Sequence, residues 1–291
     1  MQLKKGDEKI KKTVALAAFA AVAAASTLSF AGGPARTGVN GSLHDMNLYN
    51  APGNAHGGLQ DQYNRVCVFC HTPHNATVDD GGMNPLPLWG NDITTKSQDP
   101  YQWATPANAD ALGTPADQLI GPSRLCMTCH DGTLALDAHT SNGTLNNGNF
   151  KLTGSRAIGS DDSLLIKTHP IGFDYVVAKT KRNNQTTTVG GVTSTYAIQE
   201  IVDEGEGFAT KITASPTQGT YNSVERKGTR SIASVLYSGP NGGKIMTCAT
   251  CHEVHNKENV TQDVAIKGAT PNYFLYAKES ESLICLSCHV K

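Results

Sequence analysis

The sequence is poor in aromatic residues and, more generally, in bulky apolar ones. Aromatic side chains make up 6% of its 291 residues and hydrophobic side chains 38%, and part of that apolar share lies in one N-terminal run. Burial of apolar surface has to offset the conformational entropy that a chain loses on folding. A chain this polar would struggle to build an ordinary core. Either part of it is disordered, or large apolar cofactors fill its interior.

The sequence also lacks a hydrophobic run long enough to cross a membrane. Its apolar stretch at residues 13–25 is shorter than the roughly 20 residues that a spanning helix needs. Five lysines precede this stretch and Ser29-Phe30-Ala31 follows it, a pattern typical of a cleaved secretory signal rather than a membrane anchor. No cysteine precedes Cys67 that could carry an N-terminal lipid. We predict a signal peptide at 1–31 and no stable membrane insertion.

Positive charge is not in excess. Residues 1–31 contain five Lys, one Asp and one Glu, so the mature chain keeps 19 basic and 23 acidic residues and a net charge of −4. Nucleic-acid-binding surfaces are basic, and we expect no nucleic-acid partner. A basic partner or a metal oxide is compatible with this charge.

No cysteine lies outside four Cys-x-x-Cys-His motifs. One helical turn between the two sulfurs lets them form thioethers to both vinyl groups of one haem, and the adjacent histidine then faces the iron. We therefore predict four covalently bound haem c groups. The attachment residues are Cys67, Cys70, Cys126, Cys129, Cys248, Cys251, Cys285 and Cys288. The proximal iron ligands are His71, His130, His252 and His289.

Two other uses of paired cysteines compete with haem attachment. Exported proteins usually pair their cysteines as disulfides, and two Cys-x-x-Cys pairs can form a tetrahedral zinc site. Neither use requires a histidine directly after every second cysteine. The repeated histidine therefore favours haem.

Six further histidines could supply the second axial ligands. Only four methionines lie outside the signal, and two of those are within or beside a motif. His74 and His255 each follow a motif histidine by three residues. Side chains with this spacing lie on nearly the same side of the backbone, whereas the two axial ligands of one iron lie on opposite faces of the porphyrin. We predict that each ligates a neighbouring haem.

The remaining candidates are less constrained by their spacing. His169 precedes Pro170, which keeps it out of a helix interior, and it is predicted to be a distal ligand. His44, beside Asp45, is favoured over His56 as the fourth. His139 is expected to be solvated. Only two residues follow His289, so the fourth haem must take its distal ligand from upstream or from another molecule.

The expected fold is that of a multihaem cytochrome c, mostly coil, with short helices at the haem motifs and a few β-hairpins, organised around a haem chain. The β-prone runs 196–202 and 231–237 suggest hairpins. The predicted regions are an extended N-terminal arm at 32–66, a region of haems 1 and 2 at 67–160, a haem-free β/loop insertion at 161–246, and a region of haems 3 and 4 at 247–291.

The motif segments resemble a known family. Residues 67–75 (CVFCHTPHN), 125–133 (LCMTCHDGT), 169–175 (HPIGFDY), 248–256 (CATCHEVHN) and 283–289 resemble the doubled-CxxCH multihaem cytochromes of metal-reducing bacteria, and within that group the filament-forming tetrahaem outer-surface cytochromes. The resemblance implies a bis-histidine haem chain, with subunits stacked into an extracellular nanowire. It places His74, His169, His255 and His44 at ligand positions, one of them donated by the adjacent subunit.

No phosphate-binding loop, nucleophile elbow or carboxylate pair is recognisable, so we do not expect an enzyme. The predicted function is extracellular electron transfer, with other cytochromes or extracellular metal oxides as redox partners and a filament of identical subunits. The alternatives are a periplasmic electron shuttle and, less favoured, a multihaem reductase with an open haem iron.

Overall fold

The computed structural model describes part of the chain, all of it within the compact unit that spans Ala35–Lys291. The predicted signal peptide and His56 lie outside the described residues. Those residues are 38–49, 60–72, 74, 76, 88–91, 117–141, 144–146, 148–153, 157–158, 165, 168–184, 186–195, 199–213, 224–239, 242–256 and 273–290.

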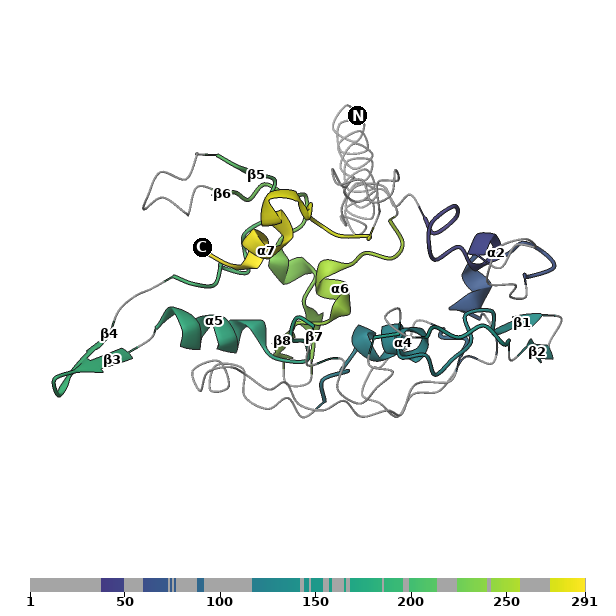
Figure 1. Cartoon of the computed structure of the whole chain (residues 1–291), viewed down its shortest axis with the longest axis horizontal. Helices are drawn as coiled ribbons and strands as arrows, with labels where there is room; N and C mark the ends of the chain where they lie inside the picture. Colours follow the sequence, from purple (N-terminus) through teal and green to yellow (C-terminus); the bar gives the residue numbers. More distant parts are fainter. Residues whose placement is uncertain are drawn as a thin grey trace, which may run out of the picture. The chain divides into compact units, whose positions relative to one another are not determined.

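Secondary structure in this part of the chain consists of short elements (Figure 1). Helical elements lie at all four cysteine motifs, and no described helix exceeds nine residues. None of the described helices has the length and apolar character that a bilayer crossing requires. The helices are α2 (Met46–Tyr49), η1 (Cys67–Phe69), α4 (Pro122–His130), α5 (Tyr175–Asn183), η4 (Ile232–Ser234), α6 (Cys248–Cys251), η6 (Ser280–Ser282) and α7 (Leu283–Cys288).

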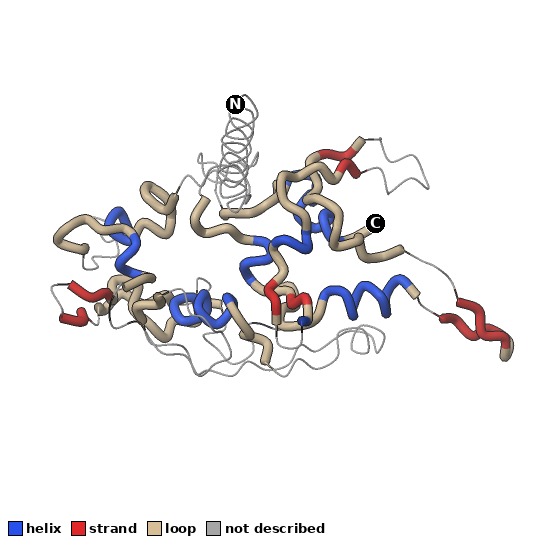
Figure 2. The backbone as a smooth tube through the Cα atoms, turned by 180° about the vertical axis from the view of Figure 1, so that it is seen from behind, coloured by secondary structure: helices blue, strands red, loops and turns tan. Residues whose placement is uncertain are grey.

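The described strands form two-stranded antiparallel sheets, drawn red in Figure 2. The β3–β4 hairpin turns at Gly190 and Gly191, whose φ angles of 60° and 81° suit a two-residue hairpin loop. The pairs are β1 (His139–Ser141) with β2 (Thr144–Asn146), β3 (Thr186–Val189) with β4 (Val192–Thr195), β5 (Lys211–Ile212) with β6 (Val224–Glu225), and β7 (Tyr237–Ser238) with β8 (Lys244–Ile245).

The predicted strand positions in the middle of the chain were wrong. In the run 231–237, residues 232–234 form the 3-10 turn η4, Ser231 makes an isolated bridge with Gly207, and only Tyr237 enters a strand. In the run 196–202, the described residues 199–202 contain a single isolated bridge, between Ile201 and His289. Buried Ile232 and Val202 both pack in one apolar cluster, so tertiary packing overrides their β propensity.

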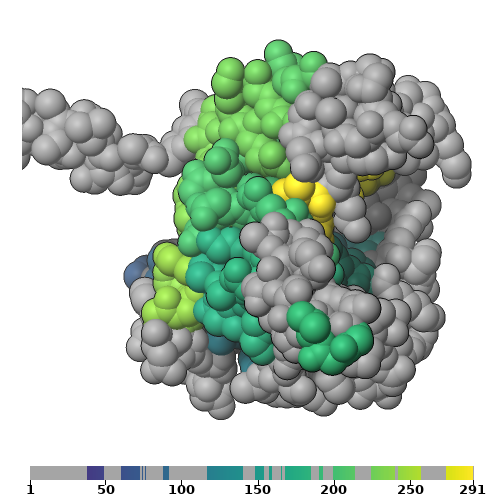
Figure 3. All heavy atoms as spheres, turned by 90° about the vertical axis from the view of Figure 1, so that its left-hand side faces the viewer, coloured from purple at the N-terminus to yellow at the C-terminus, as the bar shows by residue number. Residues whose placement is uncertain are grey.

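The middle segment, residues 161–246, contributes described residues that pack against the last cysteine motif. Phe173, Val202 and Ile232 pack with Cys288 in the largest apolar cluster. The backbone N–H of Val202 donates to the carbonyl of Cys288 (2.9 Å), and that of Ala209 donates to Oγ of Ser287 (2.9 Å). Figure 3 shows the yellow C-terminal residues beside the green middle segment. The insertion without a haem motif therefore packs against a motif that lies elsewhere in the sequence.

The sequence suggested an extended N-terminal arm, but the described part of this arm is folded. It contains turns and helix α2, and the side chains of Asp45, Met46 and Asn47 are buried. The carboxylate of Asp45 accepts the backbone N–H of Gly41 (2.8 Å), which closes a turn around His44. The N–H of Gly38 donates to the carbonyl of His255 (3.0 Å). The arm is thereby attached beside the third motif.

Candidate metal centres

All eight cysteines are free thiols carried on or beside short helical turns. The three-residue step places the two sulfurs of a motif on the same side of such a turn. Helix α4 begins at Pro122, after Gly121 in a left-handed conformation (φ 63°), where an added Cβ would lie 2.7 Å from the Tyr237 ring. Helix α6 is held by a capping box between Thr247 and Thr250. The local sequence thus fixes where each thiol pair points.

Electrostatic interactions between thiols indicate which motifs lie near one another. Burial raises the pKa of Cys129 to about 12, and the nearby Cys70 thiol of the first motif adds to the rise. The pKa of Cys251 rises to about 12 through burial and, next, through Cys288 of the fourth motif. The first motif is therefore near the second, and the third near the fourth.

The second and third motifs touch directly. The thiols of Cys126 and Cys248 are hydrogen-bonded, which raises the pKa of Cys126 and lowers that of Cys248 to about 7. The backbone N–H of Cys248 also donates to Oγ of buried Ser123 on α4 (3.1 Å). Each motif is therefore near the motif that follows it in the sequence.

Three motif histidines each face a histidine from outside the motifs. The ring centroids of His71 and His255 are 6.1 Å apart, and the rings are inclined by 27°. Those of His44 and His130 are 6.0 Å apart, and those of His169 and His289 are 6.3 Å apart. Each pair combines a predicted proximal ligand with a predicted distal one.

This spacing fits an iron between two imidazoles. An imidazole nitrogen binds a first-row metal at about 2.0 Å, so two bonds in line and the distance from each nitrogen to its ring centre span roughly 6 Å. Aromatic pairs without a metal cover a wider range: Phe69 and His139, tilted by 58°, are 4.7 Å apart, and His71 and Trp89, edge to face, are 6.0 Å apart. The donor set of these three pairs therefore suits axial ligation of haem iron.

Hydrogen bonds at Nδ1 leave Nε2 available on several of these rings. Nδ1 of His169 donates to the carbonyl of Pro170 (2.8 Å), and Nδ1 of His252 donates to that of Tyr273 (2.6 Å). Nδ1 of His255 lies 3.5 Å from the carboxylate of Glu253. Such partners fix the tautomer and orientation of a metal-ligating imidazole.

His44 occupies a different environment. Its Nδ1 is buried without a hydrogen-bond partner, and its ring packs 4.9 Å from that of Phe274. Burial lowers the pKa of His44 to about 4, with smaller contributions from His130, His252 and His255. Burial also lowers the pKa of His130. Both rings are therefore neutral at pH 7, which is the form that binds metals.

No protein-family model matches the chain, and no curated protein matches its sequence.

The third motif differs from the other three. Among the residues that the structure describes, no second imidazole faces His252, and none faces His74 either; both residues are exposed. Oγ1 of Thr72 donates to the backbone carbonyl of His74 (2.6 Å), which fixes the turn after the first motif. The His74 imidazole does not belong to any of the three histidine pairs. The predicted proximal ligand His252 and the predicted distal ligand His74 are thus not paired with another histidine in the described part of the chain.

His139 is buried, and the expectation that it is solvated was wrong. Its side chain is 1% exposed, and its ring packs against Phe69 of the first motif. Nδ1 donates to the carbonyl of Asp137 (2.8 Å), and Nε2 lies 3.8 Å from Asp61. These contacts place it in the structural surroundings of the first motif.

Glu253 is a site residue that we did not single out from the sequence. It lies between the two histidines of His252-Glu253-Val254-His255, and a carboxylate within such a pair is the available signal. In the described part of the chain no three His, Cys, Asp or Glu side chains form a cluster that could hold a metal ion. An iron in a porphyrin takes only two axial ligands from the protein, so this finding does not bear on the pairs.

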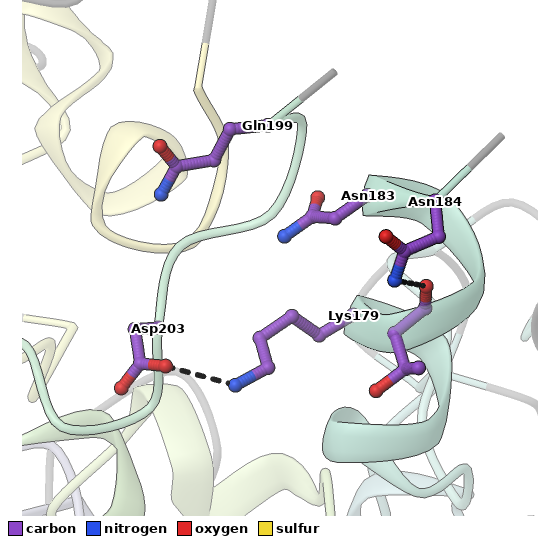
Figure 4. A pocket seen from close by; sticks show the side chains of 6 residues that line it. Lys179, Asn183, Asn184, Gln199 and Asp203 are labelled. Atoms are coloured by element: carbon purple, nitrogen blue, oxygen red, sulfur yellow. Dashed lines mark hydrogen bonds and ion pairs between the residues drawn. The ribbon is translucent and has the colours of Figure 1, made fainter. Parts of the chain in front are cut away.

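A polar pocket of about 240 Å³ lies between α5 and the segment that follows the β3–β4 hairpin (Figure 4). Nζ of Lys179 points at Asp203 (2.9 Å), and the amide of Asn183 bonds to the backbone at 200–201. Its lining is Lys179, Thr180, Asn183, Asn184, Gln199 and Asp203, with neither cysteine nor histidine. These groups serve to fasten α5 to the adjacent chain.

Proposed function

We propose that this chain is an exported electron-transfer protein that carries four covalent haem c groups in a row. The observation that carries the proposal is the set of three histidine pairs at 6.0–6.3 Å, each containing one motif histidine. The neighbouring thiols support a row in the order of the motifs. When bound, the haem groups supply one-electron exchange at iron.

The chain's own residues position these groups and limit access to them. The thiols would attach each haem covalently, and the three histidine pairs would each supply two imidazoles to one iron. An iron held by two imidazoles would leave no site for a substrate, so the proposed role is electron transfer rather than catalysis. Buried Leu119 and Met127 pack beside Cys248, where the second and third motifs meet, and exclude water there. Two imidazoles per iron favour low potentials compared with His/Met ligation.

We further propose that copies of the chain assemble into a filament. His289 faces His169 of the same chain, so His169 would serve as the upstream distal ligand of the last motif. The motif left without a described partner is the third, and exposed His74 is the unused donor. The resemblance to the filament-forming tetrahaem outer-surface cytochrome E supports a contact between identical subunits. The redox partners would be other cytochromes or metal oxides outside the cell; a periplasmic shuttle is the alternative.

The first test is haem content. The secreted protein is expected to give four haems per chain in a pyridine haemochrome assay and a mass that includes four covalent groups. Its oxidised EPR spectrum should be low-spin. A protein without covalent haem would overturn the proposal, and a high-spin component in the wild type would favour the reductase with an open third iron.

The second test removes single ligands. His74→Ala should turn one of four haems high-spin without loss of covalent haem, because the cysteines and the proximal histidine remain. His169→Ala is the positive control and should do the same at the fourth motif. His139→Gln is the negative control and should leave all four haems low-spin. An unchanged spectrum for His74→Ala would remove His74 from the ligands.

Electron microscopy of secreted protein distinguishes a filament from a shuttle. If His74 ligates an iron in a neighbouring copy, His74→Ala should shorten or abolish filaments, whereas His139→Gln should not. Uniform monomers in the wild type would leave the shuttle as the function.

A further inference from the structure

The candidate axial histidines differ in what their Nδ1 atoms meet. Nδ1 of His169 and of His252 donates to a neutral backbone carbonyl. Nδ1 of His44 is buried without a partner. Only at His255, among these four, does Nδ1 lie near a carboxylate, that of Glu253 at 3.5 Å. The His71–His255 pair therefore has a carboxylate beside Nδ1 of one of its two rings.

Glu253 is held in place from several directions. Its carboxylate accepts the backbone N–H of His255 (3.2 Å) and the hydroxyl of Tyr276 (3.4 Å). Its own backbone N–H donates to the carbonyl of Phe274 (2.8 Å). The side chain is only 11% exposed, so solvent screens its charge weakly. The Glu253 carboxylate is therefore a fixed, weakly screened negative charge beside the His255 imidazole.

Arg230 opposes this charge from another part of the chain. Its guanidinium lies 3.7 Å from the second oxygen of Glu253 and 5.8 Å from the centre of the Tyr276 ring. The Arg230 side chain is itself mostly buried. The arginine therefore neutralises part of the carboxylate's charge without occupying the side that faces His255.

A carboxylate beside Nδ1 of an axial imidazole strengthens the imidazole as a donor at Nε2. Stronger donation, together with nearby negative charge, stabilises ferric iron more than ferrous iron and lowers the reduction potential. We propose that Glu253 is the positioning residue that sets the potential at the first motif, below the value that a neutral Nδ1 partner would give, and that Arg230 limits this effect. The inference rests on the proposed haem chain.

The test is a spectroelectrochemical titration of the secreted holoprotein. Glu253→Gln keeps the shape and removes the charge, and should raise one of the four potentials by about 59 mV, which is a tenfold change for a one-electron couple. It should also change the EPR g values of one low-spin haem. Glu225→Gln on the β6 strand, where the glutamate pairs with Lys211 and Lys227, is the matched control and should leave all four potentials in place.

Arg230→Gln gives a shift that structural damage would not mimic, because it should lower the same potential that Glu253→Gln raises. If Glu253→Gln fails to retain haem, the potentials of Arg230→Gln alone test the inference. Unchanged potentials in a variant that keeps four haems would overturn the inference and leave the haem chain standing. A wild type without haem would instead overturn the proposed function.

Discussion

At the scale of single residues, Asp61 shows how polar groups organise the surroundings of the first motif. Its buried carboxylate accepts backbone N–H groups from Tyr63 (3.1 Å) and Arg65 (2.8 Å), and also the Arg65 guanidinium (2.5 and 3.0 Å). On its other side lies His139, packed on Phe69. The hydrogen bonds from Arg65 lower the pKa of Asp61 to about 2. This carboxylate therefore stabilises the folded chain in its ionised form.

Asp61→Asn should destabilise the protein in a pH-dependent way. Because the pKa in the folded state lies below the ordinary value of 3.8, the stabilisation is complete above about pH 4 and disappears as the pH falls towards 2. The expected loss at pH 7 is about 1–2 kcal/mol, reduced from the full pKa effect because Arg65 is partly exposed. Urea unfolding of both proteins at pH 7 and pH 3 measures it. Asp203→Asn, in an exposed pair with Lys179, should cost less, and a pH-independent loss for Asp61→Asn would contradict the assignment.

The proposed haem-attachment residues could be recognised from the sequence, because the motif that defines them lies within one helical turn. The burial of His139 depends instead on Phe69 and Asp61, which are about 70 residues away in the sequence. No local pattern around His139 indicates these contacts. The surroundings of His255 could be predicted in part. The Glu253 carboxylate is close in sequence, whereas Arg230 and Tyr276 are brought to Glu253 only by the fold.

At the scale of elements, α5 connects the middle segment to the last motif. Asp174 caps the helix by accepting the N–H groups of Val176 (2.9 Å) and Val177 (3.0 Å). Lys181 and Arg182 lie in the last turn, where positive charge is favourable. The second oxygen of Asp174 accepts the N–H of Lys244 on β8 (3.1 Å). One side chain therefore begins a helix and attaches it to a strand.

Asp174→Ala should destabilise the protein by about 2 kcal/mol, since it removes an N-cap, typically worth about 1 kcal/mol, together with the bond to β8. Asp174→Asn keeps a capping oxygen and should lose about half as much. Urea unfolding followed by circular dichroism measures both variants. Equal losses would show that the cap contributes nothing.

Helix α5 was not predicted, because residues 161–246 were assigned to a β/loop insertion, although Asp174 before an apolar run and a basic last turn form a helix-start and helix-end pattern. The strands were harder to place, because two-residue pairs such as β5–β6 and β7–β8 contain too few residues for a periodic pattern. The run 231–237 is rich in β-branched and apolar residues, yet it turns so that Ile232 and Leu236 enter the same cluster.

At the scale of the whole described unit, apolar burial is divided into separate clusters beside the motifs. The largest contains Cys288, a second includes Met127 of the second motif and adjoins Cys248, and a third adjoins Leu286 of the fourth motif. The spatial order of the motifs follows from contacts such as that of Cys126 with Cys248, which are 122 residues apart and so invisible to local spacing. Among the described residues, these clusters contain four to eight buried residues each.

Removal of haem should therefore abolish cooperative folding. Ordering costs about 1–2 kcal/mol per residue, and apolar burial returns about 25 cal/mol per Å², so small clusters cannot stabilise this chain by themselves. Apoprotein made in a host without haem-attachment enzymes should show no cooperative thermal transition by circular dichroism, whereas the holoprotein should show one. A Cys285→Ala/Cys288→Ala variant should keep three haems and lose hydrogen-exchange protection first at residues 199–213, because Val202 and Ala209 bond to the fourth motif. Apoprotein that melts within a few degrees of the holoprotein would contradict the view that the cofactors replace a conventional core.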